Sequence, residues 1–219
     1  METVPDAPPA AAPLHGRPET QARILAAALA LLEEAPTKPP SMSAIARRAG
    51  VSRQALYLHF ETRAQLLVEA ARRLDEIKGS DARLAPSRAA TDGRRRLREF
   101  IAAWGGFIPE IHGVARAFLA MRAEDPDAAA AWEDRMAALR HGCAAAVAAL
   151  KADGALAEGL AEEAATDLLW ALLSVGNWEM LTTERGWSQE AYVAGMQRAA
   201  EAMLTCAPEA GGGAGDGGG

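Results

Sequence analysis

The sequence has few cysteines and few aromatic residues, and each shortage argues against certain classes of protein. Its two cysteines, Cys143 and Cys206, lie far apart in a chain of 219 residues. This argues against a disulfide-rich scaffold and a cysteine-based zinc site, and it favours reduced thiols in a cytoplasmic protein. Aromatic residues make up 5% of the chain, and β-branched residues are sparse beside Ala, Leu, Glu and Arg. Because these four residues are good helix formers, the composition predicts an all-α fold.

Long apolar runs are also absent. No segment approaches the roughly 20 apolar residues that span a bilayer, so we expect no membrane partner. The start, METVPDAPPAAAPLHG, lacks the basic and apolar regions of a secretory signal. Its proline and alanine content predicts a disordered arm over residues 1–16, and the glycine-rich end predicts a disordered tail over 207–219. We therefore expect a cytoplasmic protein.

Charge is distributed unevenly along the chain, whose net charge is −6. Between residues 17 and 63 there are seven basic and four acidic residues, and from residue 79 onward thirteen basic and twenty acidic ones. A basic N-terminal part on an acidic remainder indicates that only the first part meets a polyanion, although many solvated faces carry a similar excess.

Apolar residues recur at helical spacing over most of the sequence, and strand-like alternation is absent. The predicted helices are 20–34 with Thr20 as N-cap, 42–49, 53–59, 63–77, 94–108, 111–123, 126–152, 158–184 and 188–206. This gives about nine helices, with a polar connection over 78–91. The expected organisation is a DNA-binding unit over 17–63, a connecting helix over 64–80, and a larger helical domain over 81–206.

Residues 42–49 and 53–59 form two short helices joined by a turn that contains Gly50. This is the pattern of a helix-turn-helix, whose second helix enters the major groove of DNA. The spacing places Arg53, Gln54, Tyr57 and Leu58 on one face of that helix and apolar residues on the other, with Ser52 as N-cap. Arg and Gln can read base edges, whereas a merely solvated face is the alternative. Leu58 has no clear partner.

The segment SMSAIARRAGVSRQALYLHFETRAQLL resembles the DNA-binding signature of the TetR family of bacterial transcriptional regulators. The matching positions are Ile45-Ala46, Ala49-Gly50-Val51-Ser52, Leu56-Tyr57, His59-Phe60 and Leu66-Leu67. The resemblance implies a homodimeric regulator, most often a repressor, that binds a palindromic double-stranded DNA operator. The expected architecture is an N-terminal three-helix DNA-binding domain followed by a helical ligand-binding and dimerisation domain.

The family's DNA contacts carry over onto six positions of this chain, and Ser52 can bond phosphate by its own hydroxyl. The six are base readers at Arg53 and Gln54, and phosphate contacts at Tyr57, His59, Arg63 and Ser41. The family commonly has a small residue where Gln54 stands and a lysine where Arg63 stands. His59 has an alternative role, because the helical wheel turns it toward the inner flank, where it would pack instead of binding phosphate.

The C-terminal part carries bulky residues that could line a cavity for a small apolar or amphipathic effector. The candidates are Trp104, Phe107, His112, Phe118, Met121, Trp132 and Trp170, although at helical spacing such residues are more often core. The stretch WGGFIPEIHG predicts that a helix ends or kinks near Pro109. His112 follows this break, as a ligand contact or as a structural histidine.

The segment DLLWALLSVGNWEML (167–181) is apolar nearly all round, which predicts burial on several sides. We expect Leu169, Leu173, Gly176 and Trp178 to form a dimer contact in a four-helix bundle. The alternative is a helix that is simply central in its own subunit.

Catalytic patterns are missing from the sequence. It has no Ser-His-Asp arrangement, metal triad or phosphate-binding loop, and its four histidines share no ligand spacing. We therefore expect that the protein is not an enzyme and that it binds no cofactor and no metal. A helical interaction module that does not bind DNA is the remaining rival.

Overall fold

The computed structural model describes residues 17–206, so the predicted arm (1–16) and tail (207–219) lie outside the described residues. The described part has ten α-helices, one π-helix and no strand, which confirms the all-α prediction. The α-helices are α1 (Arg17–Glu34), α2 (Met42–Ala49), α3 (Arg53–His59), α4 (Arg63–Ile77), α5 (Ser80–Ala89), α6 (Gly93–Met121), α7 (Pro126–Ala152), α8 (Glu162–Leu172), α9 (Val175–Trp178) and α10 (Gln189–Leu204), and the π-helix is η2 (Glu179–Glu184).

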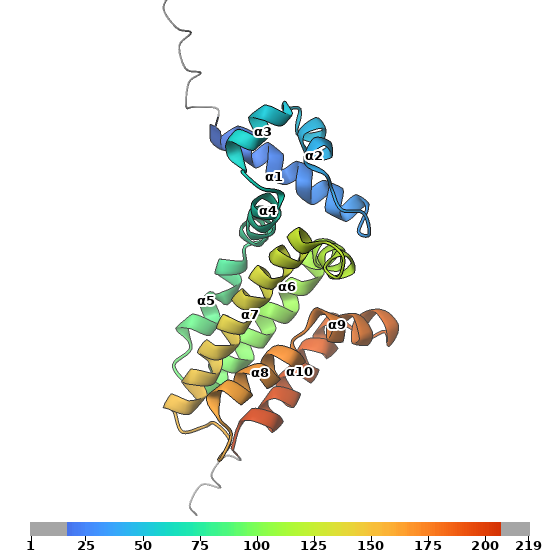
Figure 1. The fold of residues 1–219 in the computed structure, drawn as a ribbon. Helices are drawn as coiled ribbons and strands as arrows, with labels where there is room; N and C mark the ends of the chain where they lie inside the picture. The colour runs from blue at the N-terminus through green and yellow to red at the C-terminus, as the bar shows by residue number, and fades with distance from the viewer. Residues whose placement is uncertain (1–16, 207–219) are drawn as a thin grey trace, which may run out of the picture.

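Helices α1 to α3 form a small unit at one end of the molecule (Figure 1). α4 leaves this unit and leads into a longer bundle, in which α6 and α7 lie side by side between α5 on one flank and α8 and α10 on the other. In this part of the chain, no helix is long and apolar enough to cross a membrane.

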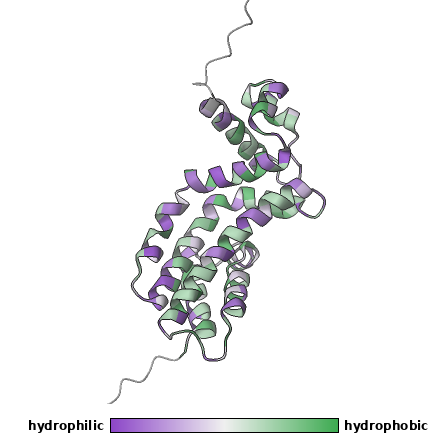
Figure 2. Ribbon diagram, turned by 60° about the vertical axis from the view of Figure 1, so that its left-hand side comes forward, coloured by the Kyte–Doolittle hydropathy of each residue, from purple (hydrophilic) through white to green (hydrophobic). Residues whose placement is uncertain are grey.

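The small N-terminal unit and the longer bundle each have an apolar core. Figure 2 shows the hydrophobic residues along the helices that form these cores. The first core joins α1 to α4 with one end of α6 and α7, for example through Leu56, Phe60 and Phe118. The second core lies among α6, α7, α8 and α10, around residues such as Ile101 and Tyr192. Because α6 and α7 contribute to both cores, the DNA-binding unit is packed directly on the larger domain.

The four N-terminal helices match the sequence pattern closely. α2, α3 and α4 have the expected bounds, and α1 begins three residues before the expected cap at Thr20. Proline is tolerated in the first turn of a helix, so Pro18 does not prevent the earlier start.

The predicted helix end at Pro109 is wrong, since α6 continues from Gly93 to Met121. A proline cannot donate to the carbonyl four residues earlier, which here belongs to Gly105. That carbonyl instead accepts a hydrogen bond of 2.6 Å from the side-chain amide of Gln189 on α10. The distant glutamine therefore replaces the bond that the proline removes, and the helix continues.

Two other segments differ from the prediction. Residues 80–89 form α5, which the polar sequence and Pro86 had indicated as a connection. The expected long helix over 158–184 is three shorter ones, because the amide of Asn177 donates to the carbonyls of Ala171 and Leu172 at the end of α8. Ser174 then caps α9.

Candidate nucleic-acid interface and ligand cavity

The helix-turn-helix is fixed by two serine caps and a left-handed glycine. The hydroxyl of Ser41 accepts from the N–H of Ala44 at 3.2 Å, and that of Ser52 accepts from the N–H of Ala55 at 3.0 Å. Gly50 between the helices has φ 67°, a conformation that glycine adopts without a Cβ clash. Each serine is exposed, and its hydroxyl keeps a hydrogen that can be donated to a phosphate.

Helix α3 has one buried face and one exposed face. Leu56 is completely buried, and Phe60, which ends the helix, is almost so. The exposed side chains are Arg53, Gln54, Tyr57 and Leu58, and Leu58 has 69% of its surface exposed. The structure thus brings the predicted base readers together on one surface. His59 is half-buried at the end of the helix.

The basic residues around α3 differ in how they are engaged. Arg48 forms an ion pair of 2.6 Å with Glu34, which partly neutralises that end of α2. Within residues 17–206, neither Arg47 nor Arg53 takes part in an ion pair, and both are exposed. Both arginines therefore offer a full positive charge to a polyanion at this surface.

Arg63, predicted as a phosphate contact, is bound by protein groups in this structure. Its guanidinium donates to the carbonyl of Pro40 at 2.7 Å, to both carboxylate oxygens of Asp125 at 2.9 and 2.8 Å, and to Asp127 at 3.0 Å. Only 17% of the side chain is exposed. These hydrogen bonds raise the pKa of Arg63 and lower the pKa of Asp125. The guanidinium holds the loop before α2 and the start of α7 together.

The sequence gives one signal for this contact. The acidic pair of the EDPD segment fits the start of α7, and Asp125 does cap that helix by accepting from the N–H groups of Asp127 and Ala128. Asp125 also binds the guanidinium of Arg63, which lies 62 residues earlier in the sequence. An arginine can bridge two carboxylates in a way that a lysine cannot, so the departure from the usual lysine fits the observed contact.

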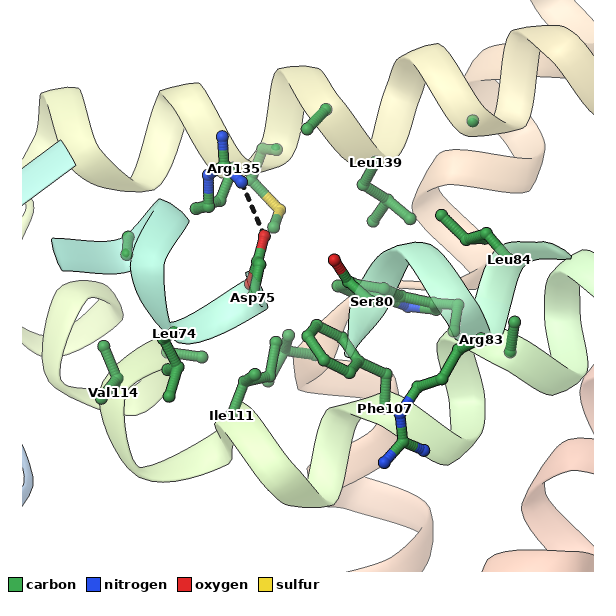
Figure 3. Close-up of a pocket in the computed structure, with 18 of the residues that line it drawn as sticks. Leu74, Asp75, Ser80, Arg83, Leu84, Phe107, Ile111, Val114, Arg135 and Leu139 are labelled. Atoms are coloured by element: carbon green, nitrogen blue, oxygen red, sulfur yellow. Dashed lines mark hydrogen bonds and ion pairs between the residues drawn. The ribbon is translucent and has the colours of Figure 1, made fainter. Parts of the chain in front are cut away.

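A cavity of about 240 Å³ lies among α4, α5, α6 and α7 (Figure 3). Most of its wall is apolar, and its aromatic members are Phe100, Trp104, Phe107, Phe118 and Trp132. Such a concave apolar space with a few polar groups is the usual character of a small-molecule site. Its polar members are Asp75, Ser80, Arg83 and Arg135, and no pattern in the sequence indicates them.

Four of the seven predicted pocket residues line this cavity, namely Trp104, Phe107, Phe118 and Trp132. The other three do not. His112 lies 2.7 Å from the carboxylate of Glu179, Met121 is buried in the N-terminal core, and Trp170 is partly exposed and donates to the carbonyl of Met136. His112 and Trp170 point away from the cavity toward these partners, whereas Met121 lies on the same face of α6 as Phe118, one turn farther along the helix, in the neighbouring core.

The predicted dimer residues fall into two groups. Leu169 and Leu173 are completely buried inside the subunit, so they cannot contact a partner. The face of α8 that carries them therefore fits the alternative, a helix that is central in its own subunit. Gly176 is exposed, with no neighbour where a Cβ would stand. Trp178 is half-buried and donates to Gln189 at 2.9 Å.

The described residues contain no group of three or more His, Cys, Asp or Glu side chains that could hold a metal ion. Cys143 is buried and Cys206 partly so, and both are free thiols. Burial raises the pKa of Cys143 to about 12, which makes it an inert core residue.

Fold and site together define a class: an all-α protein with an N-terminal helix-turn-helix and a C-terminal domain that encloses a cavity. Residues 24–70 match the family model described as bacterial regulatory proteins of the tetR family. The TetR resemblance is thereby confirmed for the DNA-binding unit. Members of this family are non-enzymatic DNA-binding transcriptional regulators, in agreement with the function class predicted from the sequence. No curated protein matches the chain.

Solved structures share the fold over most of the chain. A TetR-family transcriptional regulator from Rhodococcus sp. has 20% identity and a TM-score of 0.68, with 86% of this chain and 100% of that chain covered. The regulator FadR from Bacillus subtilis, in complex with stearoyl-CoA, has 16% identity and a TM-score of 0.66, over 82% and 96% of the chains. NalD, a repressor from Pseudomonas aeruginosa, has 21% identity and a TM-score of 0.62, over 86% and 97%.

Proposed function

We propose that the protein is a transcriptional repressor that binds a palindromic DNA operator as a homodimer and releases it when a small ligand enters the cavity. The observation that carries this proposal is that two helices belong both to the cavity wall and to the contact with the DNA-binding unit. Helices α4 and α7 line the cavity, and the same two helices hold the DNA-binding unit through Arg63 and Asp125.

The exposed face of α3 supports DNA as the partner. Arg53 can bond guanine in the major groove and Gln54 can bond adenine, while Tyr57 and the serine caps Ser41 and Ser52 can donate to phosphate. The opposite face of the helix is buried, so the orientation of these groups is fixed by the core. A general helical interaction module would have no need of a rigid helix that presents arginine and glutamine at its exposed N-terminal end.

The cavity supports regulation by a ligand. α4 begins just after α3 and contributes Leu74 and Asp75 to the cavity, whereas α7 begins at the Arg63 contact and contributes Trp132 and Arg135. A ligand that separates these helices would move α3 with them. Such a ligand must bind one conformation more tightly than the other in order to shift the population.

The outer faces of α8 and α10 support a dimer contact. On α8, Leu168 is 43% exposed and Ala171 lies beside it on the surface. On α10, Ala199 and Ala202 are exposed. α8 and α10 pack on each other, so two copies would form a four-helix bundle through small and apolar side chains. This contact replaces the buried Leu169 and Leu173 with their exposed neighbours and retains Gly176 as a candidate.

Two of the related structures agree with these roles. NalD is described as a repressor, and FadR from Bacillus subtilis is described in complex with stearoyl-CoA. The fold therefore accommodates both repression and ligand binding.

The direct experiment is a selection of bound fragments from a random pool of double-stranded DNA by the purified full chain. We expect palindromic sites with half-site centres about one helical turn, ~34 Å, apart. A screen for compounds that release the selected fragment then tests the regulatory part. Selection of no common sequence would refute the repressor assignment, and sites without two-fold symmetry would refute the dimer.

A further inference from the structure

The cavity is bordered by a cluster of charged side chains from α4 and α7. Arg72 pairs with Asp134 at 2.6 Å and with Glu69 at 3.5 Å. Arg135 pairs with Asp75 at 2.6 Å, and its remaining contacts go to Asp134. Three carboxylates thus face two guanidinium groups, so the cluster carries one negative charge in excess.

Asp75 is the carboxylate of this cluster that lines the cavity (Figure 3). One of its oxygens accepts from Arg135, and no other hydrogen bond to its carboxylate occurs among the described residues. Burial raises the pKa of Asp75 in spite of the arginine, and the charges of Asp134 and Glu76 add to the effect. The negative charge at this position is therefore incompletely stabilised by the protein alone.

The groups around Asp75 suit a positive charge with N–H donors. The hydroxyl of Ser80 points toward the same space as the carboxylate, and it can accept a hydrogen bond (Figure 3). The aromatic rings of Trp104, Phe107 and Trp132 also line the cavity, and the face of such a ring attracts a cation. Arg83 and Arg122 already lie over the rings of Phe107 and Trp132, so Trp104 is the ring that suits a ligand cation.

Arg83 is the other cation in the wall, and it is engaged elsewhere. Its guanidinium donates to the carbonyls of Lys78 and Gly106 and to Glu110. It lies 5.8 Å from the centre of the Phe107 ring and points away from Asp75 (Figure 3). It therefore leaves the space beside the Asp75 carboxylate to a ligand.

We infer that the cavity selects a small aromatic ammonium compound, whose charged nitrogen bonds Asp75 and Ser80 while its apolar part lies among the aromatic rings. This inference rests on the proposed function for the role of the cavity, and it adds the chemical class of the effector. A cavity of ~150 Å³ holds one benzene ring. The volume of about 240 Å³ thus leaves room for one ring and a short chain that ends in an amine.

The test uses three probes of nearly equal shape with the full-length protein at neutral pH. They are phenethylammonium, the neutral 2-phenylethanol and the anionic phenylacetate, with binding measured by titration calorimetry. We expect the cation to bind at least about tenfold more tightly than either of the others, as a hydrogen bond to a charged group would give. The wild-type comparison needs no variant, so it does not depend on whether a mutant folds.

A charge substitution inside the cavity sharpens the test. Asp75→Asn should weaken phenethylammonium by about ten- to a hundredfold and strengthen phenylacetate, because Arg135 then lacks one carboxylate partner. The matched control is Asp81→Asn on α5, which removes the same charge from a side chain that is 88% exposed and should leave all three affinities unchanged.

The outcomes separate the ligand class from the regulatory role. Binding of the neutral or anionic probe as tightly as the cation, or no binding of the cation at millimolar concentration, overturns the ammonium inference and leaves the repressor proposal standing. Tight binding of the cation supports the inference, even if the protein with the cation bound still binds the selected DNA. In that case it is the proposal of ligand-induced release that fails.

Discussion

Asp125 binds the guanidinium of Arg63 through two hydrogen bonds, of 2.9 and 2.8 Å, and with the same carboxylate it caps the first turn of α7. The contact joins the starting ends of α4 and α7, which come from opposite sides of the domain boundary. A single carboxylate thus couples the position of the DNA-binding unit to the helix that carries Trp132 and Arg135 into the cavity.

The first prediction concerns the stability that this contact contributes. Asp125→Asn keeps an oxygen that can cap α7 and removes the charge that holds Arg63. Because both side chains are largely buried, we expect the free energy of unfolding to fall by about 1–3 kcal/mol, measured by urea denaturation. The matched change Asp81→Asn breaks an exposed pair with Arg88 and should cost less than about 0.5 kcal/mol. Equal losses would show that the buried contact contributes no more than a surface pair.

The same pair predicts a dependence on pH. The hydrogen bond from Arg63 lowers the pKa of Asp125 in the folded state, so its contribution is present above the unfolded pKa, about 3.9, and is lost as the pH falls through the folded pKa. The difference in stability between the wild type and Asp125→Asn should therefore be largest at about pH 5 to 7 and shrink below about pH 4. A difference that stays constant down to strong acid would contradict the electrostatic origin.

A second prediction separates the two arginines of the DNA-binding unit. Arg53→Ala should relax the preference for one base at a cost of about 1–3 kcal/mol, because the exposed side chain can reach a base edge. Arg63→Ala should leave base preference and the salt dependence of binding unchanged, since its guanidinium is occupied by Asp125 and Asp127. The measurement is binding to matched and mismatched fragments over a series of salt concentrations.

The result for Arg63 has a clear alternative. If the arginine leaves its carboxylates and binds a phosphate on DNA, its removal will lower the slope of log K against log salt by about 0.9. That outcome would restore the contact suggested by the family resemblance and would make the Arg63–Asp125 bond a feature of the DNA-free state alone.

The parts of the fold that the sequence predicts are those governed by neighbours in the chain. The bounds of α2, α3 and α4 depend on Ser41, Ser52 and Thr62, each of which caps the helix that it precedes. The exposed face of α3 follows from helical spacing in the same way. Local caps and spacing were therefore sufficient for the recognition helix.

The parts that were missed depend on residues far apart in the sequence. Gln189 supports α6 from 84 residues away, and Arg135 reaches Asp75 across 60. A helical pattern identifies residues that face inward, but it does not say which of them meet. For the same reason Trp104 and Trp132 were found in the cavity wall, while Met121 belongs to the neighbouring core.

A third prediction tests the support of α6 by Gln189. Gln189→Leu leaves the buried carbonyl of Gly105 without its donor, so we expect a loss of about 1–3 kcal/mol in the free energy of unfolding. Gln197→Leu is the control, because Gln197 makes a similar bond to the carbonyl of Arg98 at an exposed position. The control should cost about 1 kcal/mol or less.

Pro109→Ala makes this test specific. Alanine supplies the backbone N–H that proline lacks, and this group can donate to the Gly105 carbonyl in place of Gln189. The double variant should therefore lose less stability than Gln189→Leu alone, with a coupling of about 0.5–2 kcal/mol in a double-mutant cycle. Strict additivity would mean that the glutamine does not act through this carbonyl.

The last prediction concerns the proposed dimer face on α8 and α10. Leu168→Glu places a charge on the exposed side of α8, and a two-fold contact repeats that charge in both copies. Each copy should cost the dimer about 2 kcal/mol or more, so the protein should sediment with half the wild-type mass at micromolar concentration. Leu58→Glu on α3 is the matched control, since Leu58 is 69% exposed and lies in the DNA-binding unit. It should weaken DNA binding and leave the dimer intact, whereas dissociation by both variants, or by neither, would place the dimer contact on another surface.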